Sequence, residues 1–425
     1  MPRYYVWTIG CQMNKADSDH VIGYLERAGY SSTDSPEHAD FILVNSCVVR
    51  QNAEDKVLNK LMALKAVKKK ARNTIIALTG CLVDSRAEEL KQRFPWLDIV
   101  FRPREWEAVS RWAEARGLPR LQESDSVLAQ AGSVTAYVPA IHGCNNFCSY
   151  CIVPYRRGRE RSRDLDEIWC HVKVLVDRGV KEVTLLGQNI GAYGRDLPYR
   201  PDLADLLTEL DKIQGLLRIR FLTNHPRDVS EKLIRAVGRL EKVCKHISLP
   251  MQAGDNDILR AMRRGYTVEQ YADLVGQVRS AIPQVALSTD VIVGFPNESD
   301  EQYENTLRWL RELRFDRIHV AAYSPRPGTI ASRKFPDNVP AEKKKLRLRE
   351  IESLHESIAS EINAQSVGQS VEVLVEGKQK GRWQGRTRGD KLVFFTDKSD
   401  ADLTGQLVNV TVEKASAWAL QGSRV

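Results

Sequence analysis

The residues best suited to chemistry in this chain are its cysteines, because thiolates bind metals and carry redox reactions. The eight cysteines are Cys11, Cys47, Cys81, Cys144, Cys148, Cys151, Cys170 and Cys244. A 425-residue chain whose N-terminus lacks the apolar core of a signal peptide is expected in the cytoplasm, where disulfides are rare. Clustered cysteines in such a chain indicate metal or redox chemistry.

Three of these cysteines form one compact group, in which Cys144, Cys148 and Cys151 have C-x3-C-x2-C spacing. His142 adjoins the first of them without the usual spacing of a zinc ligand, and no fourth cysteine follows nearby. A structural zinc would need a fourth ligand, whereas an iron–sulfur cluster held by three thiolates leaves one iron open to a small molecule. The spacing therefore favours an iron–sulfur cluster, with zinc as the alternative.

Three more cysteines, Cys11, Cys47 and Cys81, each follow a short apolar run that predicts a strand. These runs are residues 4–9, 41–44 and 74–79. Helical patterns separate them, and strand–helix–strand alternation implies a parallel sheet, whose carboxyl-terminal edge gathers such residues. We expect the three thiols to converge on an iron–sulfur cluster or on a zinc with an open position. Three independent buried cysteines are the alternative.

The elements around these cysteines are predicted from apolar periodicity. Asp17 is expected to cap a helix that ends before Gly29, and residues 53–71 are predicted to form a lysine-rich helix. Cys170 lies in a predicted helix and Cys244 precedes a predicted strand. Both are interpreted as small hydrophobic core residues.

The compact cysteine group and its surroundings resemble the radical S-adenosylmethionine superfamily, in its methylthiotransferase version. The matching segments are residues 10–14, 143–163, 186–189, 249–254, 290–296 and 323–329. The first of them, Gly-Cys-Gln-Met-Asn, resembles the branch that modifies tRNA, the 2-methylthio-N(6)-dimethylallyladenosine synthases. The chain departs from the residues that this family more often has at Arg156, Asn224, Ala253 and Asn297.

The resemblance implies a 4Fe-4S cluster at Cys144, Cys148 and Cys151, with S-adenosylmethionine chelated to its open iron. It also implies an auxiliary 4Fe-4S cluster at the other three sites, which are Cys11, Cys47 and Cys81. One S-adenosylmethionine would methylate a sulfur at the auxiliary cluster. A second would be cleaved reductively, with electrons from a donor protein, to a 5′-deoxyadenosyl radical.

The implied product carries a methylthio group on carbon 2 of isopentenylated adenosine at position 37, beside the anticodon of tRNA. Threonylcarbamoyl-adenosine in tRNA and an aspartate of a ribosomal protein are alternative substrates within the family. Outside it, a non-catalytic, metal-containing RNA-binding protein is the alternative. Four amides are expected to hold cofactor polar groups, with turn chemistry as their alternative role: Gln188, Asn189, Asn224 and Gln252.

The chain is predicted to be an α/β protein with four parts. Residues 1–130 would form an N-terminal parallel-sheet domain that carries the auxiliary cluster. Residues 131–335 would form the radical core, because about six strands alternate with helices there and suit an incomplete (βα)6 barrel. A basic helical linker over 336–365 would lead to a small β-barrel over 366–425, which resembles the TRAM domain, an RNA-binding module.

The charge of the chain permits a nucleic acid partner without requiring one. Lys and Arg total 63 against 55 acidic residues, a net charge of +8. Five arginines between residues 156 and 163 are assigned to phosphate contact, cofactor contact or a solvated face. In the last domain, cations surround an aromatic residue predicted to stack on a base: Lys378, Lys380, Arg382, Trp383, Arg386 and Arg388. A solvated hairpin is the alternative there, and no apolar run is long enough for a membrane helix.

Overall fold

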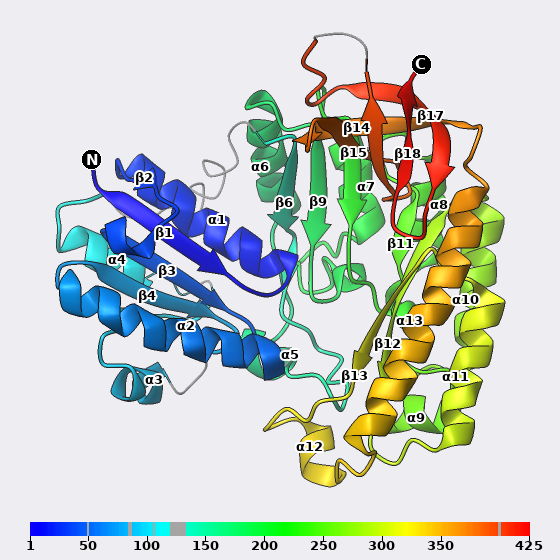
Figure 1. Cartoon of the computed structure of the whole chain (residues 1–425), viewed down its shortest axis with the longest axis horizontal. Helices are drawn as coiled ribbons and strands as arrows, with labels where there is room; N and C mark the ends of the chain where they lie inside the picture. The colour runs from blue at the N-terminus through cyan, green and yellow to red at the C-terminus, as the bar shows by residue number, and fades with distance from the viewer. Residues whose placement is uncertain (49–50, 84–86, 104, 106, 120–132, 398–400) are drawn as a thin grey trace.

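The computed structural model describes residues 1–48, 51–83, 87–103, 105, 107–119, 133–397 and 401–425. It is a three-part α/β arrangement (Figure 1), with an N-terminal sheet on one side, a curved set of strands in the centre and a β-barrel at the C-terminal end. The predicted boundary at residue 130 lies outside the described residues, and the divisions at 335 and 365 stay predictions.

The N-terminal sheet is parallel, with strand order β2-β1-β3-β4-β5. Its strands are β1 (Arg3–Thr8), β2 (Ser31–Ser32), β3 (Phe41–Ser46), β4 (Ile75–Gly80) and β5 (Ile99–Val100). The helices are α1 (Gln12–Arg27), α2 (Gln51–Lys70), α3 (Ala87–Arg93) and α4 (Glu107–Glu114), with the 3₁₀ turn η1 (Pro36–His38). Apolar side chains of α2 and α3 cover one face of the sheet, and those of α1 and α4 cover the other. Because both faces are covered, every residue of β3 and β4 is buried.

The start of α1 differs from its prediction. The helix begins at Gln12, with Cys11 at the N-cap position, so Asp17 lies inside the helix and caps nothing. Asp17 is buried, and its carboxylate is paired with Arg157 of the central domain. A buried carboxylate needs such a partner, and the helix pattern alone did not reveal it.

Six parallel strands form the central domain, as two three-stranded sheets with orders β10-β9-β6 and β11-β12-β13. The strands are β6 (Thr135–Pro139), β9 (Glu182–Leu186), β10 (Arg218–Phe221), β11 (His246–Ser248), β12 (Ala286–Val293) and β13 (Arg317–Ala322). A parallel bridge joins Ile219 of β10 to Val243, which lies just before β11 of the other sheet. The predicted incomplete barrel is confirmed.

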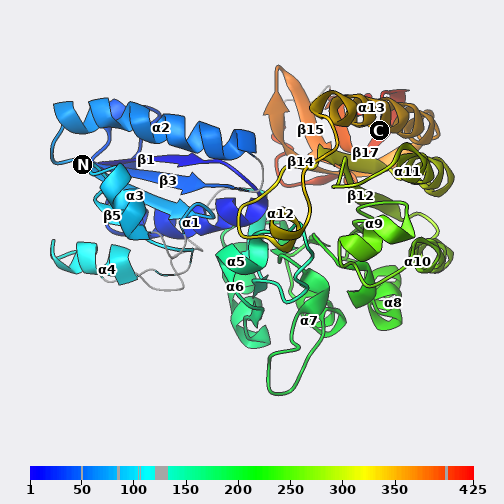
Figure 2. The same ribbon diagram turned by 90° about the horizontal axis from the view of Figure 1, so that it is seen from below.

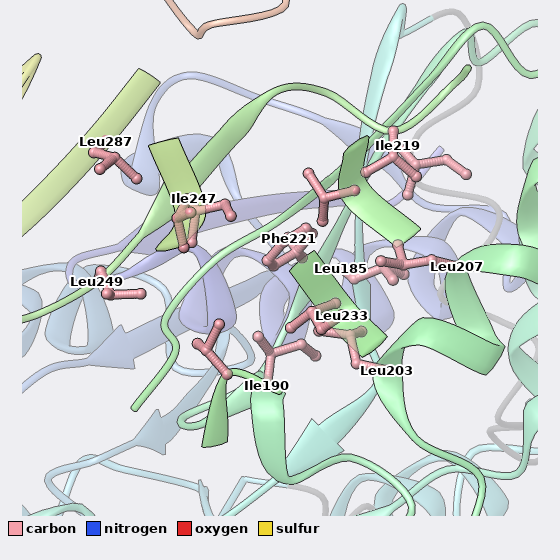
Figure 3. Packing of buried hydrophobic residues seen from close by; sticks show 14 of the residues in the cluster. Leu185, Ile190, Leu203, Leu207, Ile219, Phe221, Leu233, Ile247, Leu249 and Leu287 are labelled. Carbon is pink, nitrogen blue, oxygen red and sulfur yellow. The ribbon is translucent and has the colours of Figure 1, made fainter. Parts of the chain in front are cut away.

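Helices surround these strands on the outside (Figure 2). They are α6 (Leu165–Asp177), α7 (Leu203–Asp211), α8 (Glu231–Arg239), α10 (Val268–Ala281) and α11 (Asp300–Leu313). Shorter elements are β7 (Ile141–His142), α5 (Val153–Arg157), β8 (Arg161–Ser162), η3 (Ile190–Ala192), η4 (Pro226–Asp228), α9 (Asn256–Ala261) and α12 (Ile330–Lys334). In the core (Figure 3), strand residues such as Leu185 and Phe221 pack with Leu207 and Leu233 of the helices.

A long helix, α13 (Ala341–Ala364), leads to a closed barrel with strand order β14-β15-β16-β18-β17. Its strands are β14 (Ser370–Gln379), β15 (Arg382–Arg386), β16 (Leu392–Thr396), β17 (Leu407–Ala415) and β18 (Leu420–Arg424). The predicted small β-barrel is confirmed. None of the described helices is both long and apolar enough to cross a membrane.

The aromatic residue predicted to stack on a base is not available for it. Trp383 is only 6% exposed and packs in the core of the barrel, so the prediction is wrong for this residue. Lys378 lies over its ring at 4.3 Å. Arg386 forms ion pairs with Glu376 and Asp390, and Arg388 forms an ion pair with Glu372.

Two buried arginines of β10 attach the barrel to the central domain. Arg218 donates to the backbone oxygen of Arg386 at 2.6 Å and to the Glu372 carboxylate at 2.9 Å. Arg220 donates to the backbone oxygen of Thr387 at 2.7 Å and pairs with Glu182 at 2.8 Å. The two arginines of β10 therefore donate hydrogen bonds to backbone oxygens of the barrel, and these bonds attach the barrel to the central domain.

We predict that Arg220→Met destabilises this attachment, because it leaves the Glu182 carboxylate buried without its partner. The expected cost is about 3 kcal/mol, visible as a lower urea midpoint of the first unfolding transition. The matched control is Arg235→Met, which removes an exposed i,i+4 pair with Glu231 and should cost less than about 0.5 kcal/mol. Equal midpoints for the two variants would contradict the assignment.

Candidate functional site

The N-terminal cysteines lie at the carboxyl edge of the first sheet, where they were predicted. The ends of β3 and β4 pair in register, so Cys47 and Cys81 follow them side by side. The Cys81 amide donates to the Ser46 oxygen at 2.8 Å. A Cβ at Gly10 would stand 2.9 Å from the Cys47 Cβ, which brings the loop carrying Cys11 against Cys47. Parallel register thus gathers three thiols that are far apart in the chain.

Asn14 holds the loop of Cys11 in place. Its Nδ2 donates to the Ile9 and Ser46 oxygens at 3.0 and 2.8 Å, and its Oδ1 accepts from the Cys11 thiol at 3.6 Å. The same Oδ1 accepts from Arg157 at 2.8 Å. Cys11 itself occupies the N-cap position of α1.

Cations surround these sulfurs. Burial raises the pKa of the Cys81 thiol, and the positive charge of Arg157 acts in the opposite direction. Arg326 interacts with Cys47 and pairs with Glu54 at 3.3 Å. Negatively charged thiolates, or a cluster carried by them, are therefore met by guanidinium groups from the central domain.

The second cysteine group lies in the segment between β7 and α5, and its backbone is tightly packed. Gly143 has φ +75°, and a Cβ there would lie 2.0 Å from the Arg159 oxygen. The Cys144 amide donates to the Gly158 oxygen at 3.2 Å. Asn145 closes the loop through two hydrogen bonds of 3.0 Å to the Glu160 carboxylate. The segment that follows the cysteines thus clamps the segment that carries them.

The far end of this cysteine loop is held by the α9 region. The Ser149 hydroxyl donates to the Ala261 oxygen at 2.7 Å, and its amide donates to the Met262 oxygen at 2.9 Å. Arg264 is buried and donates to the Cys148 sulfur at 3.2 Å. Burial opposes this positive charge, but Tyr150, Tyr266 and Cys148 outweigh it, so the pKa of Arg264 is raised and the side chain stays charged.

The thiols of this loop fit a cationic metal centre. Burial raises the pKa of Cys144 to about 11 and that of Cys151 to about 12, and the neighbouring sulfurs add to both shifts. Buried thiolates such as those of Cys144 and Cys151 become stable ligands when iron supplies positive charge beside them. Within the described residues, no three His, Cys, Asp or Glu side chains lie close enough together to hold a single metal ion.

Two of the predicted cofactor residues have partners within the fold. Gln188 Oε1 accepts from the Gly143 amide at 2.5 Å and so braces the cysteine loop. Asn189 donates to Asp228 at 2.6 Å and accepts from the His225 amide at 3.0 Å. Both amides organise the ends of strands, as expected for the turn chemistry alternative.

The other two predicted cofactor residues keep a polar atom without a partner. The side-chain oxygens of Asn224 and Gln252 are buried and accept no hydrogen bond from any of the described residues. Gln252 has φ +71° and follows a loop after β11, and Thr223, next to Asn224, has φ +69°. Buried acceptors on strained backbone are typical of ligand sites, because such an arrangement is costly without a bound group.

Gln252 lines a cavity of about 210 Å³ that also includes Cys151. Polar side chains of Asp290, His319 and Arg326 face this cavity. Its remaining lining residues are Tyr150, Ile152, Val153, Val291, Ile292, Ala321, Ala322, Tyr323 and Ser324. The cavity joins the second cysteine group to Arg326, which in turn interacts with Cys47 of the first group.

Several site residues were missed by the sequence analysis. Arg157 was part of an arginine run whose members were not assigned individually, and Arg264 carries no local signal. Asp290 and His319 are opposite each other in the register of β12 and β13, which pattern alone does not reveal. Of the two cysteines interpreted as core residues, Cys244 is buried but Cys170 is exposed, so that prediction is wrong for Cys170.

Three families match the chain in separate regions. The radical SAM superfamily matches residues 138–310, the uncharacterized protein family UPF0004 matches residues 3–102, and the TRAM domain matches residues 364–425. The fold and the cysteine loop thus define a radical S-adenosylmethionine enzyme, a class that implies a 4Fe-4S cluster and S-adenosylmethionine.

Full-length relatives identify the family more closely. The chain is 51% identical to the tRNA-2-methylthio-N(6)-dimethylallyladenosine synthase of Dehalococcoides mccartyi, over 100% of this chain and 99% of the relative. It is 45% identical to the enzyme of the same name from Dictyoglomus thermophilum, over 99% and 98% of the two chains. The chain belongs to the family of tRNA-2-methylthio-N(6)-dimethylallyladenosine synthases, and the family predicted from the cysteine motifs is confirmed.

Solved structures with this fold are more distant. The radical S-adenosylmethionine methyltransferase TsrM from Kitasatospora setae has a TM-score of 0.58 at 13% identity, covering 78% of this chain and 74% of its own. The cobalamin-dependent radical enzyme OxsB has a TM-score of 0.52 at 12% identity, covering 83% and 56%. At such low identity these likenesses show the fold alone.

We predict that Gly143→Ala disrupts the cysteine loop, because its methyl group would overlap the Arg159 backbone. The reconstituted variant should lose the iron bound at this loop and the corresponding visible absorbance. Gly158→Ala is the matched control, since Gly158 has a similar φ of +80° but open space at its Cβ position. An iron content in Gly143→Ala equal to that of Gly158→Ala would contradict the role assigned to this close contact.

Proposed function

We propose that the chain places a methylthio group on carbon 2 of N(6)-isopentenyladenosine at position 37 of tRNA, beside the anticodon. One 4Fe-4S cluster would be held by Cys144, Cys148 and Cys151, and an auxiliary one by Cys11, Cys47 and Cys81. The observation that carries the proposal is the cavity that Cys151 and Arg326 both line, because the charge of Arg326 also interacts with Cys47. One arginine thereby links the cavity beside the second cysteine group to the first group.

When bound, the clusters and S-adenosylmethionine supply reductive cleavage, hydrogen abstraction and a methylated sulfur. The protein contributes binding and orientation. The unpartnered oxygens of Gln252 and Asn224 are acceptors suited to the amino or hydroxyl groups of S-adenosylmethionine. Arg264 holds Cys148 from outside the cavity and balances the charge of the ligand set.

The cavity walls also protect a reactive species. Ile152, Val153 and Ile292 contribute apolar side chains to the lining. Such walls keep water from a carbon-centred radical and suit the apolar groups of the substrate. The Gln188 bond to Gly143 keeps the cysteine loop in one position while substrates exchange.

Recognition of tRNA is assigned to the TRAM barrel. In the barrel, Lys380 and Arg382 lie at the turn between β14 and β15, away from the buried Arg218 and Arg220 contacts. A separate electron donor protein is needed because reductive cleavage consumes an electron. The reaction is placed in the cytoplasm, where tRNA is available. The relation to enzymes named for tRNA modification supports these assignments.

The proposal is tested with anaerobically reconstituted protein, S-adenosylmethionine, a chemical reductant and tRNA that carries isopentenyladenosine at position 37. Mass spectrometry of the nucleosides should show the 2-methylthio product together with 5′-deoxyadenosine. Exchange of Cys144, Cys148 and Cys151 for Ala should abolish both products. Exchange of Cys11, Cys47 and Cys81 for Ala should abolish the methylthio product and leave 5′-deoxyadenosine formation measurable.

Three results would overturn the proposal. The first is protein that carries zinc and no iron after reconstitution. The second is absence of 5′-deoxyadenosine, which favours a non-catalytic RNA-binding protein. The third is unchanged isopentenyladenosine in tRNA, which redirects the search to threonylcarbamoyl-adenosine or a ribosomal protein as substrate.

We further predict that Gln252→Leu weakens S-adenosylmethionine binding by about tenfold or more, since a buried hydrogen bond acceptor for the cofactor is lost. Equilibrium dialysis with the iron-loaded protein measures this affinity. Gln188→Leu is the comparison: it releases the cysteine loop and should reduce bound iron first. If Gln252→Leu binds S-adenosylmethionine like the unmodified chain, Gln252 is not a cofactor residue.

A further inference from the structure

Arg157 connects the two cysteine groups physically. It ends α5, the helix that begins two residues after Cys151, and its side chain is only 4% exposed. Its Nη2 reaches the N-terminal domain and donates to Asp17 at 2.9 Å and to Asn14 at 2.8 Å. Both acceptors belong to α1, the helix that begins immediately after Cys11. One guanidinium therefore extends from the second cysteine group to the first.

The same guanidinium acts on the N-terminal thiols. Its Nη1 is buried and has no hydrogen-bond partner among the described residues, and its charge interacts with Cys81 and Cys11. Asn14 strengthens this arrangement, since its Oδ1 accepts from both Arg157 and the Cys11 thiol. A positive group thus faces two of the three sulfurs, with the Asp17 carboxylate paired to it.

Neighbouring arginines are placed differently. Arg156 interacts with Glu54 and Cys81 and adds positive charge nearby. Arg159 lies over the Phe147 ring at 4.5 Å, within the second cysteine loop. Arg161 is exposed in β8 and pairs through its backbone with His142. Among these four, Arg157 is the one whose hydrogen bonds to Asn14 and Asp17 join α5 to α1.

We propose that Arg157 is a positioning residue of the auxiliary centre, which offers a buried, unpartnered donor and a positive charge to the sulfurs of Cys81 and Cys11 and thereby raises the reduction potential of the cluster they carry. Asp17 offsets part of that charge. The inference rests on the proposed function in requiring a cluster at Cys11, Cys47 and Cys81.

The physical basis is the charge of the cluster in each redox state. Reduction adds a negative charge to a buried, thiolate-bound cluster, and a nearby cation stabilises that added charge. Hydrogen bonds to the ligating sulfur act in the same direction, as outer contacts of metal ligands do generally. Removal of Arg157 should therefore lower the potential, and removal of the Asp17 charge should raise it.

The experiment isolates the auxiliary cluster in full-length protein in which Cys144, Cys148 and Cys151 are exchanged for Ala. In this background, redox titration followed by electron paramagnetic resonance compares Arg157→Met, Arg157→Lys, Asp17→Asn and the control Arg161→Met. We expect a negative shift for Arg157→Met, a positive shift for Asp17→Asn, and values near the parent for Arg157→Lys and Arg161→Met. If Arg157→Met does not retain iron, the reduction potential of Asp17→Asn tests the inference alone, and a positive shift supports it.

A purely structural ion pair gives a different result. In that case Arg157→Met and Asp17→Asn lower thermal stability alike and leave the potential at the parent value, or shift it in the same direction, and either pattern overturns the inference. Failure of the proposed function is recognised separately. It appears as absence of a 4Fe-4S signal in the parent background itself, before any Arg157 or Asp17 exchange.

Discussion

The buried ion pair between Arg157 and Asp17 is the contact on which the arrangement of the site depends. Both side chains are 4% exposed, so each would pay a large desolvation cost alone, and removal of one partner from such a pair costs several kcal/mol. The pair holds α1 against α5, and these two helices begin just after Cys11 and just after Cys151. The distance between the two cysteine groups is therefore set by a salt bridge between domains.

Buried thiols impose a second constraint. In each cysteine group, burial raises the pKa of at least one thiol, which means that thiolates are unstable there without nearby positive charge. Each group also has a buried arginine from another segment, Arg157 beside Cys81 and Arg264 beside Cys148. The fold thus supplies part of the compensating charge and leaves the rest to bound iron, which links metal loading to the local stability of both loops.

Features governed by chain-local patterns were predictable from the sequence. Cys47 and Cys81 come directly after apolar strands, and parallel pairing places them together whatever the loops between them do. The position of Asp17 was misassigned because Cys11, a residue without a typical capping side chain, occupies the start of the helix. Trp383 was misassigned because alternation does not tell which face of a small barrel is inside. The contact of Arg264 with Cys148 spans 116 positions and has no local signature.

Arg218 and Arg220 fix the position of the TRAM barrel relative to the central domain. Both donate to backbone oxygens on the far side of the interface, which stay in place when side chains of the barrel change. The TRAM barrel is therefore held at a fixed distance from the cavity beside Cys151. Under the proposed function, an RNA bound by the barrel would present to the cavity the nucleotide that lies at this distance along it. Selection of a single base can then arise from length along a folded RNA as well as from contacts to the base itself.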